Sequence, residues 1–344
     1  MNAEIITIHS MNYGNRLQNF ALQEHLKKQG ICVRTSFGHK KSLVPLRKLR
    51  DLLLHLHRRT DKDLFLFFDT KINWKPLSQD PYAHDDSIDF YIAGSDQIWN
   101  PHFSSCRDDK FLTFVPPHKR IAYAASMGID ELPEEFRDSF RQRLSGFRRI
   151  SVREQSAQKI IADLCDLDVP VLPDPTLLLD AREWDEATNT GVLKIKEPYI
   201  LKYFLGIRNP DYEAFIADYA QKQGCRIIDI TRHGECGIPG IGPDEFVQLF
   251  KNCQAAFVDS FHGTVFSIIF RRRFLSFARP SQTGFGNMNS RFETLLGTLD
   301  LWDRYVQTPE NLAHLESETD YDAVHCRIRL LQEQADQYFQ SIFG

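Results

Sequence analysis

A histidine lies in a polar turn in the second half of the chain, where one apolar run stops and another begins. The segment Val258-Asp-Ser-Phe-His-Gly-Thr264 follows a buried strand pattern and precedes an apolar helix pattern. The first amides of a helix favour an anion, but their dipole contributes only about 0.3–1 kcal/mol, so a multiply charged anion needs a cation as well. His262 can supply that charge, and Gly263 lets a ligand approach the backbone closely. Ser260 and Thr264 complete the candidate anion site, and a capping or core histidine is the alternative.

An arginine and an aspartate end two strand patterns in the first half. Arg153 closes the run Ile150-Ser-Val-Arg153 directly before a helix pattern, so we expect it to point from the carboxyl end of a strand into a cleft. The alternative is a surface arginine paired with Glu154. Asp174, in Leu172-Pro-Asp-Pro-Thr176, also ends a strand pattern near that edge and is a candidate acceptor contact or base.

The segment Phe90-Tyr-Ile-Ala-Gly-Ser-Asp-Gln-Ile-Trp-Asn100 combines the groups that bind a sugar. Asp96, Gln97 and Asn100 offer hydrogen bonds to hydroxyl groups. The flat ring of Trp99 can pack against the C–H face of a pyranose. An Asx-rich turn with a core tryptophan has the same pattern, so both interpretations stay open.

Two further loops follow strand patterns. Near the N-terminus, Asn12, Gly14 and Asn15 link the first strand to a helix in a loop that could face an anion or a sugar, or be a plain turn. The loop does not match the dinucleotide-binding motif G-x-G-x-x-G, and the sequence contains no phosphate-binding motif G-x-x-x-x-G-K-[ST]. The sequence therefore gives no motif-based reason to expect a nicotinamide or ATP cofactor.

A Gly- and Asn-rich stretch from 284 to 291 follows the last strong strand pattern. Its composition is typical of a lid over a ligand, and an ordinary exposed loop is the alternative. Arg279, Asn289 and Arg291 are its candidate ligand contacts.

These side chains need a scaffold that brings strand ends together. Short runs rich in Val, Ile, Phe and Tyr alternate with stretches of helical period, which is typical of parallel sheets covered by helices. The runs lie at Glu4–Ile8, Val33–Ser36, Phe90–Ala93, Ile121–Ala124, Ile150–Val152 and Val169–Leu172, and again at Tyr199–Phe204, Arg226–Ile230, Ala256–Val258 and Phe274–Phe277.

A polar, Pro-bounded stretch from Asp180 to Pro198 separates the two series, and 344 residues exceed the usual size of a single core. We therefore predict an α/β fold of two Rossmann-like domains that face each other across a cleft. The N-terminal domain, 1–185, would hold the acceptor, and the C-terminal domain, 195–320, the donor. A terminal helix over 321–344 could pack back on the N-terminal domain.

Charge and cysteine content narrow the function classes. The net charge of -4 gives no reason to expect nucleic-acid binding, and seven cysteines without a C-x-x-C pair predict neither a disulfide scaffold nor a metal site. The chain begins directly with a strand pattern and has no apolar run of about 20 residues, which predicts a cytoplasmic protein. A basic amphipathic stretch from Leu46 to Arg59 could add peripheral contact with the inner face of the membrane, or cover a domain. The run Arg271-Arg-Arg273 is better explained as a solvated connector than as a phosphate site.

Four of these segments together resemble the polysaccharide pyruvyltransferase family. They are Asn12-Tyr-Gly-Asn15, Gly94-Ser-Asp-Gln-Ile-Trp-Asn100, Ser151-Val-Arg-Glu154 and Asp259-Ser-Phe-His-Gly263. The resemblance implies domains arranged as in the two-domain, GT-B-type glycosyltransferases, phosphoenolpyruvate as co-substrate, and no cofactor. It implies a hexose of a polysaccharide or lipid-linked repeat unit as acceptor, with a cyclic pyruvate ketal and phosphate as products of capsule or exopolysaccharide synthesis.

The resemblance also implies roles for single residues. His262 and Arg153 match residues that lie at the donor in the family. Ser260 stands where many relatives have an arginine, so Arg279 or Arg291 becomes the candidate replacement.

For the reaction, we expect His262 to protonate the enol methylene and Asp96 to act as base for an acceptor hydroxyl. Two rival functions stay open. One is a nucleotide-sugar-dependent glycosyltransferase, and the other is a non-catalytic glycan-binding protein of an assembly complex.

Overall fold

The computed structural model describes residues 1–36, 60–75, 83–191, 193–280 and 289–343. The basic amphipathic stretch from Leu46 to Arg59 and residues 284–288 of the Gly- and Asn-rich stretch lie outside the described residues. No helix in the described ranges is both long enough and apolar enough to span a bilayer.

The first half of the chain folds around a parallel sheet, as its alternating apolar runs predict. Over the described residues the sheet has five strands in the order β2-β1-β3-β4-β5. The strands are β1 Asn2–Ile6, β2 Cys32–Ser36, β3 Phe90–Ala93, β4 Arg120–Ala125 and β5 Arg149–Val152. The helices of this half are α1 Tyr13–Lys28, α3 Asp61–Phe68, α4 Glu134–Leu144 and α5 Gln155–Cys165.

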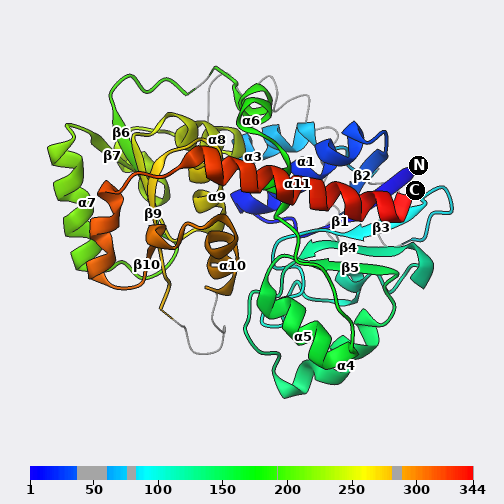
Figure 1. Ribbon diagram of the computed structural model, residues 1–344. Helices are drawn as coiled ribbons and strands as arrows, with labels where there is room; N and C mark the ends of the chain where they lie inside the picture. The colour runs from blue at the N-terminus through cyan, green and yellow to red at the C-terminus, as the bar shows by residue number, and fades with distance from the viewer. Residues whose placement is uncertain (37–59, 76–82, 192, 281–288, 344) are drawn as a thin grey trace.

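The second half repeats this plan, with a described five-stranded parallel sheet in the order β10-β9-β8-β6-β7 (Figure 1). Its strands are β6 Tyr199–Tyr203, β7 Arg226–Asp229, β8 Ala255–Val258, β9 Arg273–Phe277 and β10 Tyr305–Val306. The remaining helices are α6 Ala181–Thr188, α7 Pro210–Lys222, α8 Pro243–Asn252, α9 Phe261–Ile269, α10 Ser290–Leu299 and α11 Tyr321–Phe343. The predicted class, two Rossmann-like α/β domains, is confirmed.

One predicted strand, Val169–Leu172, is wrong. The segment makes only an isolated bridge between Val171 and Val152, supported by two backbone hydrogen bonds. Pro170 and Pro173 lack an N–H group, so a ladder cannot continue along this stretch. The segment instead leads as a linker to Asp174.

The two halves share apolar packing. One core cluster joins Leu17 and Phe20 of α1 to Phe246 of α8 and Phe266 of α9. Helix α11, red in Figure 1, then runs from the second half back to the first. Its early residues belong to that same cluster, whereas Phe339 stacks on Tyr123 of β4 with ring centroids 4.8 Å apart.

Candidate functional site

A cavity of about 640 Å³ opens where the carboxyl ends of strands from both sheets face each other. Ligands of open α/β sheets collect at this edge because the loops that follow the strands converge there. The lining comes from the loops after β1, β3, β6, β8 and β9 and from the start of α10. Among the predicted site residues it includes Asn12, Gly14, Asn15, Asp96, Gln97, Ser260, His262, Arg279 and Arg291.

His262 lies where the two halves meet. Ser260 caps α9, and its Oγ accepts a hydrogen bond from the Gly263 amide at 3.4 Å. The His262 ring, in the first turn of the helix, is buried against the backbone of Gly14 in the other domain. A Cβ atom on Gly14 would stand 2.1 Å from His262 Nδ1, so only glycine leaves room for the imidazole.

Asp174 lies behind the imidazole and contacts both predicted donor residues. Its Oδ1 accepts hydrogen bonds from the amide and hydroxyl of Thr176, and its Oδ2 accepts from Arg153 Nη1 at 2.5 Å and from Ser95 Oγ at 3.3 Å. His262 Nε2 is 3.7 Å from the same Oδ2. Burial alone would raise the pKa of Asp174, but His262, Arg153 and Thr176 outweigh it and hold that pKa well below its usual range. Asp174 is completely buried and stays ionised, so it is neither an open acceptor contact nor an effective base.

Arg153 is buried, unlike the surface arginine of the alternative interpretation. Its guanidinium also lies 3.6 Å from Asp96 and 3.9 Å from Glu154, and its Cζ is 4.5 Å from the centre of the Phe261 ring. Burial by itself would lower the pKa of Arg153, but the surrounding carboxylates raise it. The side chain stays charged beneath the cavity, whose lining does not include it.

Two further arginines reach the donor wall. Arg279 Nη2 lies 3.3 Å from Asp259 Oδ1. The Asn289 side chain bonds both the N–H and the C=O of Arg279 at 3.0 Å, so it positions that arginine and is not itself part of the lining. Arg291 is also buried, with its Cζ 5.9 Å from the centre of the Phe261 ring. Burial, and then repulsion by Arg153, lower the pKa of Arg291 to about 10.

On the opposite wall, Asp96 follows β3 with a φ of 65°, a left-handed conformation that is uncommon for residues other than glycine. Its carboxylate accepts hydrogen bonds from the Asn15 side chain and from the Gln97 amide. Asn12 caps α1 by accepting from the Asn15 amide at 3.3 Å. This network fixes the Asp96 carboxylate at the cavity surface.

Two predicted sugar contacts lie in the core instead. Trp99 is completely buried, stacks on Phe111 and donates from Nε1 to the Lys110 carbonyl at 3.0 Å. No face of its ring is left for a pyranose. Asn100 is also completely buried, and its side-chain amide donates a 2.7 Å hydrogen bond to Gln97 Oε1. Both residues therefore fit the alternative interpretation, an Asx-rich turn with a core tryptophan.

Gly263 and Thr264 likewise serve the packing of α9. A Cβ on Gly263 would approach Phe250 and Val258 to 3.2 Å, so this glycine allows the helix to lie close to β8. The Thr264 hydroxyl bonds Ser276 of β9 at 2.5 Å. Neither residue belongs to the cavity lining.

Comparison with known proteins places this site in a family. The model of the polysaccharide pyruvyl transferase family matches residues 12–281, which is most of the chain and includes Asp96, His262 and Arg279 of the cavity. The chain belongs to this family. A comparison with curated proteins gives no match.

Solved structures agree on the architecture of this pyruvyl transferase family member. MnaA of S. aureus, solved with UDP, is 10% identical, covers 99% of this chain and 97% of its own, and gives a TM-score of 0.53. The UDP-GlcNAc 2-epimerase of Methanocaldococcus jannaschii is 10% identical, covers 97% and 100%, and gives 0.50. At these identities the likeness shows the fold alone.

The cavity also holds residues that sequence reasoning missed. His9 contacts Asp69 at 3.3 Å, and burial lowers its pKa. Tyr13 stacks on Phe246 with centroids 4.5 Å apart. His9 follows the first strand, so the strand-end argument could have found it, whereas the contact of Tyr13 depends on domain packing that no local pattern records. The other missed lining residues include His102, Ser104, Ser105 and Tyr203.

Proposed function

We propose that this protein transfers pyruvate from phosphoenolpyruvate to a hexose of a polysaccharide or lipid-linked glycan, forming a cyclic ketal and releasing phosphate. Family membership supports pyruvyl transfer in glycan synthesis. The observation that carries the choice of donor is geometric, because Arg279 and Arg291 line the same cavity as His262. Repulsion among guanidiniums around one cavity is relieved by a multiply charged anion.

The donor would bind along the wall made by Ser260, His262, Arg279 and Arg291. Arg279 and Arg291 would bind the phosphate or carboxylate oxygens, in place of the arginine that many relatives carry at position 260. Arg153 would contribute its positive charge from beneath the cavity, where its planar guanidinium contacts both Asp174 and the Phe261 ring.

The chemistry needs one proton donor and a base. His262 would protonate the enol methylene, which leaves an oxocarbenium-like carbon that one sugar hydroxyl attacks. Asp96 would take the proton of the attacking hydroxyl. A second hydroxyl then displaces phosphate and its proton leaves with that phosphate, so the products are the ketal and inorganic phosphate.

Asp174 would be a positioning residue in this reaction. Its carboxylate accepts a hydrogen bond from Arg153 and lies 3.7 Å from His262 Nε2, so it contacts both of these side chains. Arg153 belongs to one domain and His262 to the other, so Asp174 aligns the proton donor with the rest of the donor wall.

The test is to incubate the protein with phosphoenolpyruvate and a panel of lipid-linked or chromogenic galactosides, glucosides and mannosides. We expect phosphate release and a product heavier than the acceptor by one pyruvate ketal. His262→Asn should lower turnover by roughly 100-fold or more, since general acid catalysis contributes about that much. His118→Asn, at an exposed histidine on the short helix Pro117–Lys119, is the matched control and should keep full activity.

Two results would reject the proposal. Binding of a nucleotide sugar without binding of phosphoenolpyruvate, measured by calorimetry, would favour a glycosyltransferase. Unchanged cellular pyruvylation with the His262→Asn variant would favour a non-catalytic glycan-binding protein.

A further inference from the structure

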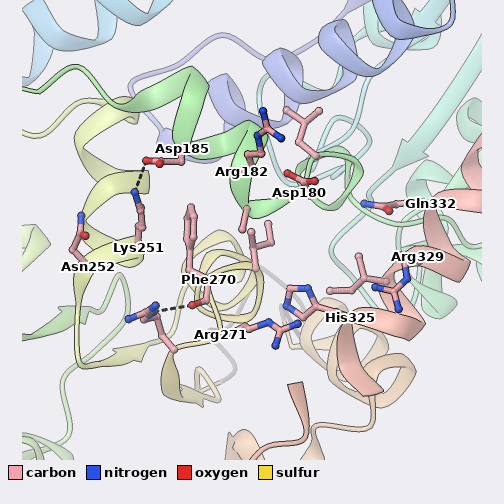
Figure 2. Close-up of a pocket in the computed structure, with 15 residues that line it drawn as sticks. Asp180, Arg182, Asp185, Lys251, Asn252, Phe270, Arg271, His325, Arg329 and Gln332 are labelled. Atoms are coloured by element: carbon pink, nitrogen blue, oxygen red, sulfur yellow. Dashed lines mark hydrogen bonds and ion pairs between the residues drawn. The ribbon is translucent and has the colours of Figure 1, made fainter. Parts of the chain in front are cut away.

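A second large groove lies away from the candidate site. It measures about 850 Å³, and α6, the end of α8, the turn from α9 to β9 and α11 line it (Figure 2). None of its lining residues also lines the cavity between the domains. A ligand here would therefore occupy a separate site.

The groove carries more positive than negative charge. The charged lining residues are Arg182, Lys251, Arg271, Arg272, His325 and Arg329 against Asp180 and Asp185. Both aspartates have partners of their own, because Asp185 pairs with Lys251 at 2.6 Å and Asp180 caps α6 by accepting from the Glu183 amide at 2.8 Å. Arg182 pairs with Glu186 at 2.7 Å, and Glu186 and then Asp180 raise its pKa, so the uncompensated charge of the groove is that of the remaining arginines.

Two of the arginines gather with His325 at one end. Figure 2 shows His325 with Arg271 and Arg329 at that end, apart from the Lys251–Asp185 pair. Within the described part of the chain, Arg329 makes no ion pair, and Arg271 is half-exposed and pairs with the exposed Asp322 at 2.8 Å. Burial lowers the pKa of His325, a hydrogen bond to the Ile268 carbonyl opposes this, and Arg271 and Arg329 lower it further. Arg271 and Arg329 repel each other, and an anion bound between them would relieve this repulsion.

The floor of the groove is hydrocarbon. Leu179, Ile269 and Ile328 contribute aliphatic side chains, and Phe270 contributes a ring. A free inorganic ion would make no use of this surface. An anion joined to an apolar chain would use both the floor and the cations.

We propose that this groove binds a phosphate-bearing amphiphile, with the phosphate between Arg271, His325 and Arg329 and the hydrocarbon chain along the floor. The groove is concave, so it fits a single lipid phosphate better than the flat surface of a bilayer. The site is independent of the pyruvyl transfer proposed for the cleft.

Calorimetry with the full-length protein and decyl phosphate below its micelle concentration tests this. We expect saturable binding, at least about tenfold tighter than inorganic phosphate, and no binding of the uncharged decyl maltoside. Arg271→Gln with Arg329→Gln should weaken decyl phosphate binding by about tenfold or more, because two charge-assisted contacts are lost. Arg329→Gln alone removes a side chain that forms no ion pair with any residue the structure describes, so it should weaken binding without impairing folding.

The controls separate the possible outcomes. Arg137→Gln with Lys222→Gln removes the same charge from α4 and α7, and should leave binding unchanged. Saturating phosphoenolpyruvate should not compete, whether or not it binds in the cleft. Three results would overturn the proposal: competition by phosphoenolpyruvate, equal affinity for inorganic phosphate, or groove-dependent binding to phosphatidic acid vesicles without binding of monomeric decyl phosphate.

Discussion

At the scale of single residues, the site depends on one glycine as much as on its charged groups. Gly14 is in the first turn of α1, and the His262 ring occupies the space where its side chain would be. The helix itself does not need glycine there, because alanine has the higher helix propensity by about 1 kcal/mol. Glycine is therefore needed at position 14 because the imidazole of His262 packs directly against its backbone.

Gly14→Ala separates activity from stability. The new methyl group would displace the imidazole from Asp174, so we expect pyruvyl transfer to fall by about 100-fold, as for loss of the general acid. The melting temperature should change little, since any crowding is offset by better helix propensity. Gly234→Ala is the control, because no heavy atom lies within 4 Å of its added Cβ. Full activity of Gly14→Ala would show that the ring position is unimportant.

Sequence reasoning placed His262 at a strand end but could not find its fit against Gly14. Strand ends are visible locally, because an apolar run stops and a polar turn begins. The contact joins residues of two domains, and neither pattern carries information about the other. Trp99 illustrates the same limit, since a tryptophan after a strand is equally consistent with a sugar platform and with the core position that it occupies.

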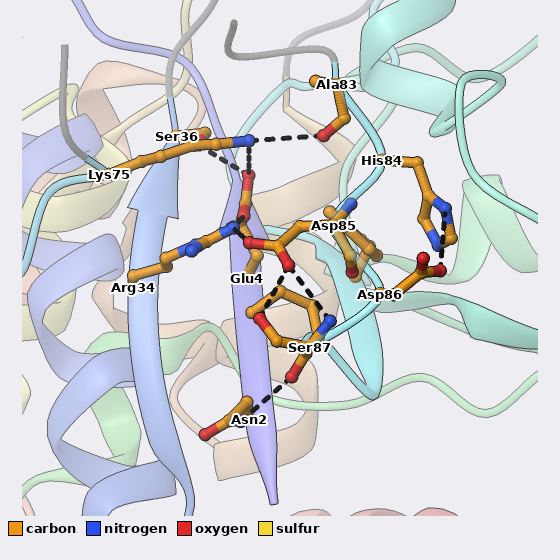
Figure 3. Close-up of polar contacts among 12 residues, drawn as sticks. Asn2, Glu4, Arg34, Ser36, Lys75, Ala83, His84, Asp85, Asp86 and Ser87 are labelled. Atoms are coloured by element: carbon orange, nitrogen blue, oxygen red, sulfur yellow. Dashed lines mark hydrogen bonds and ion pairs between the residues drawn. The ribbon is translucent and has the colours of Figure 1, made fainter. Parts of the chain in front are cut away.

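At the scale of elements, a buried ion cluster holds the first sheet together. Glu4, in the middle of β1, is completely buried. Its carboxylate accepts hydrogen bonds from Arg34 Nε and Ser36 Oγ of β2, each at 2.6 Å, and from Lys75 Nζ at 3.2 Å (Figure 3). Arg34 also reaches Asp85 at 2.8 Å. The cluster ties β1 and β2 to two segments that follow them.

Glu4→Gln should therefore be costly. It leaves the buried ammonium of Lys75 without a carboxylate, which costs about 3–5 kcal/mol in comparable buried pairs. Adding Lys75→Met should recover part of that loss, so the double variant should be more stable than the sum of the single effects predicts. Urea unfolding of the three variants measures this. Asp218→Asn, in an exposed pair with Lys222, should leave stability unchanged, and additive effects of Glu4→Gln and Lys75→Met would refute the coupling.

Element prediction succeeded where runs were apolar and failed where backbone chemistry intervened. The predicted β3 matches the structure at both ends, and the terminal helix begins at the predicted residue. Val169–Leu172 had a strand composition, but its prolines prevent pairing. Strand β10 was missed because Tyr305–Val306 is too short to form a periodic pattern.

At the scale of the whole molecule, the two domains are joined by more than the linker. The shared apolar cluster and the aromatic stack of Tyr13 on Phe246 cross the interface, and α11 contacts both sides. A large apolar interface of this kind opposes free domain motion. The cleft is consequently held ready for ligands by packing between the domains.

The interface also contains a buried pair whose pH dependence can be predicted. Asp244, at the start of α8, is 2.6 Å from Lys71, which follows α3. Burial raises the pKa of Asp244 from 3.8 to about 6, although Lys71 opposes the shift. Because the folded-state pKa is the higher one, the folded protein binds this proton more tightly than the unfolded chain. The resulting stabilisation is complete below about pH 4 and is lost as the pH rises to about 6.

Asp244→Asn removes that titration. We compare the free energies of unfolding of the native protein and the variant. Between pH 4 and pH 6.5, the native protein should lose on the order of 2–3 kcal/mol relative to the variant, and above pH 6.5 the difference should be constant. Urea unfolding of both proteins across this pH range measures the difference. Groups that titrate in the same way in both proteins cancel when the two free energies are subtracted. Asp185→Asn is a control whose difference should stay nearly flat over this range, because the hydrogen bond from Lys251 holds the pKa of Asp185 below 3.8 and its carboxyl is already largely ionised in both the folded and the unfolded chain. A difference that stays flat for Asp244→Asn would mean that its carboxyl reaches water, and that the domains are less tightly packed at this point than the shared core requires.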